Sequence, residues 1–331
     1  MEKEHENLRD KVAGCLMGCA LGDALGVPHE FRFHKNNVYT GLLYIVPEYH
    51  FQYVHRKDVI GQYSDDTEMT ICTIRSLMGS HGVYDRDTTI KTYIRWAKKA
   101  KAMGTNTRAL FKFQSKGTVK GYENRYKKMF ESKPENEWTQ SNRSLMRCSI
   151  LSFFGEDIII EDCKLTNPHP INIDSNRLYF FLIRSSSENK GKIATIREVK
   201  KMRLHVDVFK VFVNAISSKI PSRDVKGKTK GWVLHALYCA CWAWYRATSY
   251  QDGIDTIIRL GGDTDTNAAI AGGLLGAKFG LSKMKEEDRT IKNIEVLLTT
   301  DTTKGENPIE EWLLLSDFDE MVDAITLYIR I

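Results

Sequence analysis

The sequence predicts a mostly helical protein, and two observations lead to this fold class. Several segments carry apolar residues three and four positions apart, which is the spacing that gives a helix one buried face. Strand candidates are few, and they are the short segments EDIII at 156–160 and LYFFLI at 178–183. No apolar run approaches the ~18 residues that a membrane-spanning helix needs.

The first expected helix runs from about Glu6 to Leu25 and is marked by glycines at every fourth position. These are Gly14, Gly18, Gly22 and Gly26. Positions four apart share one helix face, and each glycine costs the helix roughly 1 kcal/mol relative to alanine. The stripe therefore indicates close approach by another backbone. A second stripe follows late in the chain at Gly272, Gly276 and Gly280. Contact between the two would unite both chain ends in one core, so we expect a single domain over 1–331.

The other expected helices follow in chain order at 65–78, 88–101, 231–247, 250–260 and 308–329. The second glycine stripe lies in a further expected helix that follows the oxygen-rich segment 261–267. Basic and Ser/Asn-rich patches obscure the pattern between about 154 and 230. We expect that stretch to be a variable region rich in loops.

Composition describes an ordinary globular protein. Of the 331 residues, 42% are hydrophobic and 27% are charged, as in typical soluble domains. The seven cysteines are an odd number without a Cys-x-x-Cys pair, which indicates free buried thiols in a reducing compartment. The first residues lack the apolar core of a signal peptide. We therefore expect a cytoplasmic protein with no membrane partner. A monomer is a separate expectation.

The net charge of +6 is unevenly distributed along the chain. Residues 98–133 carry eleven Lys and Arg against two acids, and residues 184–230 carry thirteen against four. Basic surfaces attract polyanions, which leaves nucleic-acid binding as a weaker alternative. Solvated helix faces and loops are the simpler interpretation of such runs.

Oxygen-bearing side chains form three clusters, at 22–30, 61–70 and 261–267. The third reads GGDTDTN. It is not a calcium loop of the EF-hand type, because Ala268 and Leu274 stand where that loop needs Gly and Glu. One cap residue would satisfy the start of a helix, yet two carboxylates and a hydroxyl crowd into four positions. Like charges this close repel unless a cation or proton intervenes, so metal binding is favoured.

The second cluster reads GQYSDDTEMT and supports the same interpretation. Asp65 and Glu68 fit a capping box ahead of an apolar run. Ser64 and Asp66 remain unexplained by capping. Hydroxyl and carboxylate oxygens together suit a hard cation such as Mg²⁺ or Mn²⁺, and two such clusters could hold two ions between them.

At these clusters the chain resembles the ADP-ribosylglycohydrolase family, which includes ADP-ribosyl-arginine and ADP-ribosyl-serine hydrolases and the dinitrogenase reductase activating glycohydrolases. The matching pieces follow the family's order: GCLMGCALGDALGVPHEF, GQYSDDTEMT, SNRSLMR, LTNPHP, GWVLHALYCACWA and RLGGDTDTNAAIAGGLLGAKFG. The resemblance implies a compact all-α fold with a binuclear metal site in a central cleft. It further implies two Mg²⁺ ions, with Mn²⁺ as the other option.

The resemblance also assigns roles to individual residues. The implied metal ligands are Ser64, Asp65, Asp66, Asp263, Asp265 and Thr266. Glu30 falls at the mouth of the site near the scissile bond, which makes it the first candidate for the proton-transferring carboxylate. Asp66 is the second candidate for that role.

Five residues are expected to contact ADP-ribose. They are Ser141, Asn142, Arg143, Ser144 and Asn167. Two of them depart from the family pattern, since Arg143 replaces a glycine and Asn167 replaces a histidine. Arg143 could clamp the pyrophosphate, fill part of the pocket or extend into solvent, and of the two functional options the clamp is the expected one because the ligand is anionic.

The function implied by the resemblance is metal-dependent hydrolysis of the bond between ADP-ribose and a modified arginine or serine side chain, or of a related conjugate. Cleavage at the ribose C1 would pass through an oxocarbenium-like state. The alternative is a non-catalytic ADP-ribose binder or a crystallin-like structural protein on the same fold. A retired site should have lost a metal ligand, and this sequence retains all of them.

Overall fold

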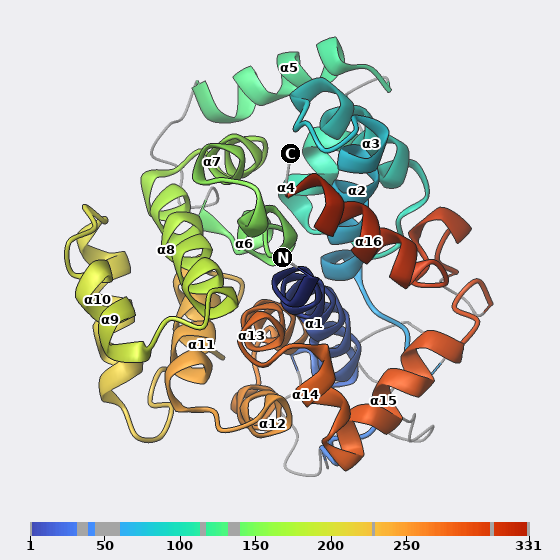
Figure 1. Cartoon of the computed structure of the whole chain (residues 1–331). Helices are drawn as coiled ribbons and strands as arrows, with labels where there is room; N and C mark the ends of the chain where they lie inside the picture. Colours follow the sequence, from blue (N-terminus) through green and yellow to red (C-terminus); the bar gives the residue numbers. More distant parts are fainter. Residues whose placement is uncertain are drawn as a thin grey trace.

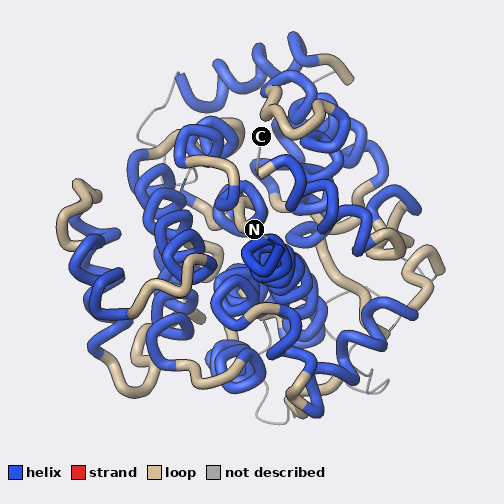
Figure 2. Tube along the Cα trace, in the orientation of Figure 1, coloured by secondary structure: helices blue, strands red, loops and turns tan. Residues whose placement is uncertain are grey.

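The computed structural model describes residues 2–31, 39–43, 60–112, 117–131, 140–226, 229–304 and 308–329. Within these ranges the chain forms α-helices joined by loops and short helical turns, and no strand (Figure 1). Figure 2 shows the same arrangement as helix and loop alone. The expected all-α fold class is confirmed.

The longer helices follow the chain from one end to the other. They are α1 (Glu2–Gly26), α2 (Asp65–Gly79), α3 (Arg86–Lys99), α5 (Val119–Tyr126), α7 (Glu156–Lys164), α8 (Pro170–Ser187), α9 (Lys192–Val199), α10 (Val206–Ser217), α11 (Val233–Arg246), α12 (Tyr250–Leu260), α13 (Thr264–Phe279), α15 (Asp288–Thr299) and α16 (Phe318–Tyr328). Three short ones lie between them, namely α4 (Thr105–Thr107), α6 (Arg143–Arg147) and α14 (Leu281–Lys285).

Helices α1 and α13 lie side by side at the centre of the molecule, although they come from opposite halves of the chain (Figure 1). Gly14 packs against the backbone carbonyl of Gly276, and Gly18 packs against that of Gly272. A Cβ atom at these positions would collide with the facing backbone. The expected contact between the two glycine stripes is confirmed. Gly280 has a different use, since it ends α13 with a φ of +84°, a conformation that suits glycine.

Helix α1 is long and apolar because it is the core helix of the fold. Among the described residues, the stretch Glu2–His29 has the length and composition to cross a membrane, and 89% of its most apolar window is buried inside the protein. Helices α8, α11 and α12 pack on α13, and α16 returns to pack on α1 and α2 (Figure 1). The central pair is therefore enclosed by helices from both halves of the sequence.

Buried tyrosines tie the surrounding helices to this pair. The hydroxyl of Tyr250, at the start of α12, donates to the backbone oxygen of Gly18 at 2.7 Å. The hydroxyl of Tyr179, on α8, donates to the backbone oxygen of Ile270 at 2.7 Å. Both side chains are buried, so water cannot replace these bonds without opening the core.

The substitution Tyr250→Phe should lower the free energy of unfolding by about 1 kcal/mol, the usual net value of one hydrogen bond. The ring would stay in place, and only its bond to the Gly18 carbonyl would be lost. Denaturant unfolding followed by circular dichroism measures the change. Tyr245→Phe is the control, because Tyr245 is only partly buried. Equal stability of the Tyr250 variant and the wild type would contradict the role assigned to this hydroxyl.

Both strand predictions were wrong. The run 156–160 lies in α7, and the run 178–183 lies in α8. Their buried residues recur at helical spacing, for example Ile159 with Cys163 and Leu178 with Leu182. A short apolar run does not by itself distinguish a strand from a buried helix segment. The region 154–230 as a whole contains the four helices α7 to α10, where we expected mainly loops.

The expected helix at 308–329 is interrupted. A short 3-10 turn spans Glu311–Leu313, and α16 begins only at Phe318. Arg75 of α2 holds the break, because it donates to the backbone oxygen of Trp312 at 3.0 Å and pairs with both carboxylate oxygens of Asp317 at 2.6 and 2.8 Å. Apolar spacing alone carries no sign of this contact.

Candidate metal centre and adjoining pocket

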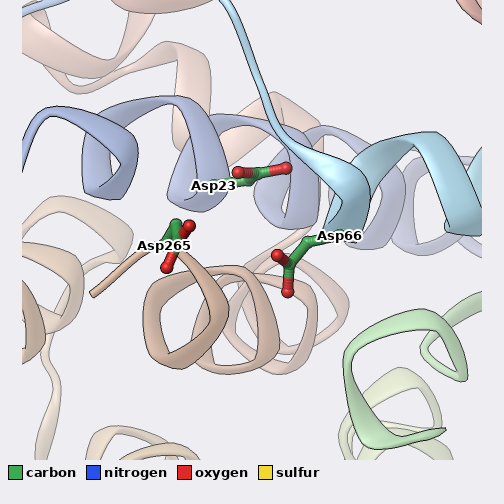
Figure 3. A group of neighbouring side chains, drawn as sticks. All are labelled: Asp23, Asp66 and Asp265. Atoms are coloured by element: carbon green, nitrogen blue, oxygen red, sulfur yellow. The ribbon is translucent and has the colours of Figure 1, made fainter. Parts of the chain in front are cut away.

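Carboxylates from separate helices face one another where α1, α2 and α13 meet. Figure 3 shows Asp23 of α1, Asp66 of α2 and Asp265 of α13 turned towards a common space. One oxygen of each lies within 4.8 Å of the other two, and all three side chains are buried. Glu30, Asp263 and Asp265 form a second group within the same distance. Because Asp265 belongs to both groups, we call these five residues the acidic cluster.

The glycine stripe of α1 explains how the backbones come together here. Its last member, Gly26, lies against the backbone of Asp265, where a side chain would collide. The hydroxyl of Thr264 donates to the backbone oxygen of Gly26 at 2.8 Å and fastens the start of α13 to the end of α1. Helices α2 and α13 both begin at the cluster, and their N-terminal dipoles favour negative charge there.

Asp23 is the member of the cluster that the sequence interpretation missed. Its carboxylate accepts hydrogen bonds from the backbone N–H groups of Ser64 and Thr67 at 3.0 Å and from their hydroxyls at 2.8 and 2.6 Å. Burial raises the pKa of Asp23 and the bonds from Thr67 and Ser64 lower it, to a net value of about 6. Asp23 thus holds the start of α2 in place. The sign of this role in the sequence was a single carboxylate within the glycine-rich, apolar stretch 12–26.

Asp66 presents an unsatisfied oxygen to the cluster. Its Oδ2 atom lies 3.0 Å from the Ser64 hydroxyl and 3.3 Å from the Thr266 hydroxyl. Its Oδ1 atom is buried and has no hydrogen-bond partner among the described residues. Burial, followed by the charges of Asp23 and Asp65, raises the pKa of Asp66 well above its usual range. A buried carboxylate oxygen without a donor is costly, and a cation would satisfy it.

Burial also raises the pKa values of two other acids in the cluster, Asp265 and Asp263. Burial raises the pKa of Asp265 well above its usual range, and the charges of Glu30 and Asp263 add to this effect. Burial also raises the pKa of Asp263, although the amide of Asn142 donates to it at 2.7 Å. Several buried acids this close need protons or a cation to share the site.

The structure brings all six expected metal ligands into one neighbourhood. Each has between 1% and 7% of its surface exposed and is therefore buried. The six are Ser64, Asp65, Asp66, Asp263, Asp265 and Thr266. Carboxylates and hydroxyls of this kind are the ligands that Mg²⁺ and Mn²⁺ prefer. The donor set and the orphaned Asp66 oxygen therefore fit a divalent cation.

A pocket of about 850 Å³ opens beside the cluster. This is the size of a site for a large organic ligand. It is lined by the acidic residues Glu30, Asp65, Asp263 and Asp265 and by the segments 103–106, 140–143 and 229–232, which we call its wall segments. Two of the wall segments, 140–143 and 229–232, are joined, since the backbone N–H of Asn142 donates to the backbone oxygen of Gly231 at 3.0 Å.

The expected ADP-ribose contacts divide into two groups. Ser141, Asn142 and Arg143 line the pocket. Ser144 and Asn167 are fully buried behind it. The Asn167 amide donates to the Ser141 hydroxyl at 3.1 Å, and the Ser144 hydroxyl accepts from Asn176 at 3.0 Å. These two residues are thus positioned to support the wall from behind.

Arg143 does not extend into solvent. Its guanidinium pairs with the carboxylate of Asp65, and its side chain is 21% exposed. The short helix α6 that carries it is anchored by Arg147, which is fully buried. Arg147 donates to the carboxylate and the backbone oxygen of Asp162, both at 2.8 Å, and to the Thr166 hydroxyl at 3.0 Å.

Two aromatic residues at the pocket were missed by the sequence interpretation. Trp232 lines one wall, and its indole N–H donates to the Gln140 side chain at 2.9 Å. Phe31 lines another part, with the Lys230 ammonium 3.4 Å from its ring centre. Their position depends on loops that meet only in the folded protein, and apolar periodicity gives no signal for it.

Comparison with known proteins adds to this picture. The sequence profile of the ADP-ribosylglycohydrolase family matches residues 4–304. An ADP-ribosylarginine hydrolase of Pseudomonas putida is 25% identical over 303 residues, covering 85% of this chain and 74% of the relative. The ADP-ribosyl-[dinitrogen reductase] glycohydrolase of Rhodospirillum rubrum is 23% identical over 322 residues, covering 88% of this chain and 97% of the relative.

The fold is also found in solved structures. A protein described as an ADP-ribosylglycohydrolase-related protein complex superposes with a TM-score of 0.71 and 19% identity, covering 98% of this chain and 99% of the other. The profile match spans the acidic cluster and all three walls of the pocket. The chain belongs to the ADP-ribosylglycohydrolase family.

Proposed function

We propose that the protein is a divalent-cation-dependent hydrolase that removes ADP-ribose from modified protein side chains, with the arginine linkage as the first substrate to test. The observation that carries this proposal is the orphaned Asp66 oxygen in a cluster of mostly buried acids beside a large pocket. Two of the relatives are named for arginine-linked ADP-ribose or for ADP-ribosylated dinitrogen reductase. Serine linkages remain the second option.

The residues that would hold Mg²⁺ or Mn²⁺ are Asp66, Asp263 and Asp265, with Ser64, Asp65 and Thr266 completing the set. The family resemblance implies two such ions. When bound, the cation would supply positive charge that orients the ribose hydroxyls and lowers the pKa of water. Asp23 would keep the ligands of α2 in register through its bonds to Ser64 and Thr67.

Glu30 is the proposed proton-transferring carboxylate. It lines the pocket and lies within reach of Asp263 and Asp265, whereas the Asp66 carboxylate is enclosed and in contact with two hydroxyls. Glu30 would accept a proton from the water that attacks the ribose C1. The bond from C1 to the side-chain nitrogen breaks, its electron pair stays on the nitrogen, and Glu30 would pass the proton taken from water to that nitrogen. Phe31 and Trp232 would offer apolar faces to the rest of the ligand.

A second candidate is a protein that binds ADP-ribose without cleaving it. The observation in its favour is the pairing of Arg143 with Asp65, which places a positive side chain beside the acidic cluster. Such a protein would use the same pocket and would not need every ligand of the cation.

Incubation with arginine-linked and serine-linked ADP-ribosyl proteins distinguishes the two candidates. We expect release of free ADP-ribose in the presence of Mg²⁺ or Mn²⁺, loss of release with EDTA, and a fall of more than ~10²-fold in Glu30→Gln, which removes the proton acceptor. Binding of ADP-ribose without release from any linkage would favour the second candidate and contradict the first.

The cellular setting forms part of the proposal. All seven cysteines are free and buried, as suits a reducing compartment. We propose a cytoplasmic monomer that acts on ADP-ribosylated proteins. Light scattering during size-exclusion chromatography would test the monomer directly.

A further inference from the structure

A buried histidine, His235, lies beside the wall segment 229–232 and has no part in the proposed chemistry. It belongs to the first turn of α11, and its backbone N–H donates to the backbone oxygen of Trp232 at 2.9 Å. The residue is 6% exposed. It does not line the pocket, whereas Thr229 and Trp232 do. Its imidazole can therefore act on a ligand only through the wall.

The neighbouring Arg223 decides which nitrogen of this imidazole carries the proton. The Nε–H group of Arg223 donates to Nδ1 of His235 at 2.7 Å. A guanidinium has donors and no acceptor, so Nδ1 must be the nitrogen without a proton. The proton then lies on Nε2, which is 3.1 Å from the Thr229 hydroxyl and donates to it. The bond to Arg223 thus fixes the bond to Thr229.

Both ends of the wall segment 229–232 are held by this pair. Thr229 accepts the imidazole proton at one end. At the other end the Trp232 ring meets the imidazole edge-on, with ring centres 5.4 Å apart, and the Arg223 guanidinium lies 5.4 Å from the Trp232 ring centre. The backbone N–H of Trp232 donates to the backbone oxygen of Thr229 at 2.8 Å and closes the segment into a turn. The residues between them, Lys230 and Gly231, are fixed as a consequence.

The charges around the imidazole keep it neutral. Burial and the charge of Arg223 outweigh the opposing charge of Asp224 and lower the pKa of His235 to about 4. Burial also lowers the pKa of Arg223, which has no carboxylate partner within the described part of the chain. A half-buried guanidinium is costly without an acceptor, and the imidazole nitrogen provides one.

We propose that His235 and Arg223 are positioning residues for the ligand pocket. Arg223 holds the imidazole in the tautomer with its proton on Nε2, and the imidazole holds the wall segment 229–232 in the shape that binds ADP-ribose. The inference rests on the proposed function for the identity of the ligand. It assigns the pair a role in affinity and none in bond cleavage.

A matched pair of substitutions tests the bonds separately from the bulk of the side chain. Methionine and glutamine have the same length, but only the glutamine amide can accept from Arg223 and donate to Thr229. Isothermal titration with free ADP-ribose should show a Kd raised about tenfold in His235→Met, and a smaller rise in His235→Gln. For release from arginine-linked ADP-ribose, KM should rise while kcat stays unchanged, which is the pattern of lost uniform binding.

Two further variants complete the design. Arg223→Met changes a loop residue and leaves α11 intact. It should weaken ADP-ribose binding, and the pKa of His235 should rise because the charge that lowers it is gone. His205→Met is the control, because His205 also lies at a helix start and accepts a hydrogen bond through Nδ1, from the backbone N–H of Asp207, but does not touch the pocket wall. It should bind ADP-ribose as the wild type does.

Nuclear magnetic resonance of protein labelled with ¹⁵N-histidine reads the tautomer in the wild type, without reliance on any variant. A proton on Nδ1 of His235 at pH 7 would overturn the inference. So would wild-type affinity in a folded His235→Met, or equal losses in His235→Met and His235→Gln. Binding of ADP-ribose without release from any linkage would refute the hydrolase, while the Kd values of the variants would still decide the inference. Absence of ADP-ribose binding in the wild type would overturn both.

Discussion

Asp265→Asn is expected to abolish ADP-ribose release without unfolding the protein. Asp265 is common to both groups of neighbouring carboxylates. Its charge therefore contributes to the binding of any cation that the cluster holds. Loss of an outer partner of a metal site typically costs 10–100-fold, and loss of this ligand should exceed ~10²-fold. The assay is release from arginine-linked ADP-ribose at saturating Mg²⁺.

The stability of the same variant makes the prediction specific. The amide has the shape of the carboxylate and can still accept the 2.8 Å bond from the Thr266 backbone N–H. It also removes one charge from a cluster whose members repel. The melting temperature of the metal-free variant should therefore equal or exceed that of the wild type, while the stabilisation that Mg²⁺ gives should disappear.

Asp87→Asn is the matched control, since Asp87 also lies in the first turn of a helix but is exposed. It should retain wild-type activity and the wild-type response to Mg²⁺. Undiminished Mg²⁺ binding by Asp265→Asn would show that Asp265 is not a metal ligand. A lower melting temperature in the metal-free variant would instead show that Asp265 serves the fold.

Gly276→Leu should destabilise the protein by several kcal/mol or prevent its folding. A Cβ at this position would meet the backbone of Gly14 and Cys15. Neither backbone can move without separating the central helices. Overpacking alone costs ~1–3 kcal/mol, and separation of α1 from α13 would add lost contacts along both helices.

Denaturant unfolding measures this effect, and the chain offers a matched control. Gly79 is the last residue of α2, and a side chain there would meet nothing within 4 Å. Gly79→Leu should therefore have a free energy of unfolding close to that of the wild type. It is a matched control because both substitutions add the same side chain to a helix. Similar stability of the two variants would refute the close contact between α1 and α13.

Features with a regular spacing could be predicted from the sequence. Glycines at every fourth position predicted the pairing of α1 with α13. Such a stripe destabilises a helix, so close approach of another backbone is its main explanation. Dense carboxylates and hydroxyls at 64–66 and 263–266 predicted helix starts that meet in one acidic site. In both cases several neighbouring residues of the same kind point to the same structural feature.

Features that depend on a single distant partner could not be predicted. The carboxylate of Asp23 is one residue, and only the folded structure shows that it holds Ser64 and Thr67. The pocket wall around Trp232 forms from three loops. For Arg143, the expected contact with the pyrophosphate stays a prediction, and the sequence carried no sign of the ion pair with Asp65. The apolar runs in α7 and α8 were too short to show their helical period.

The central position of α1 has a consequence for synthesis of the protein. Its packing partner α13 begins at Thr264, so α1 leaves the ribosome well over 200 residues before that partner exists. At about 5–20 residues per second this interval is roughly 10–50 s. During that time a helix with the length and composition to enter a membrane lacks its main packing partner, and of its native contacts only those with earlier elements such as α2 can form. The native core of the protein therefore closes only late in translation.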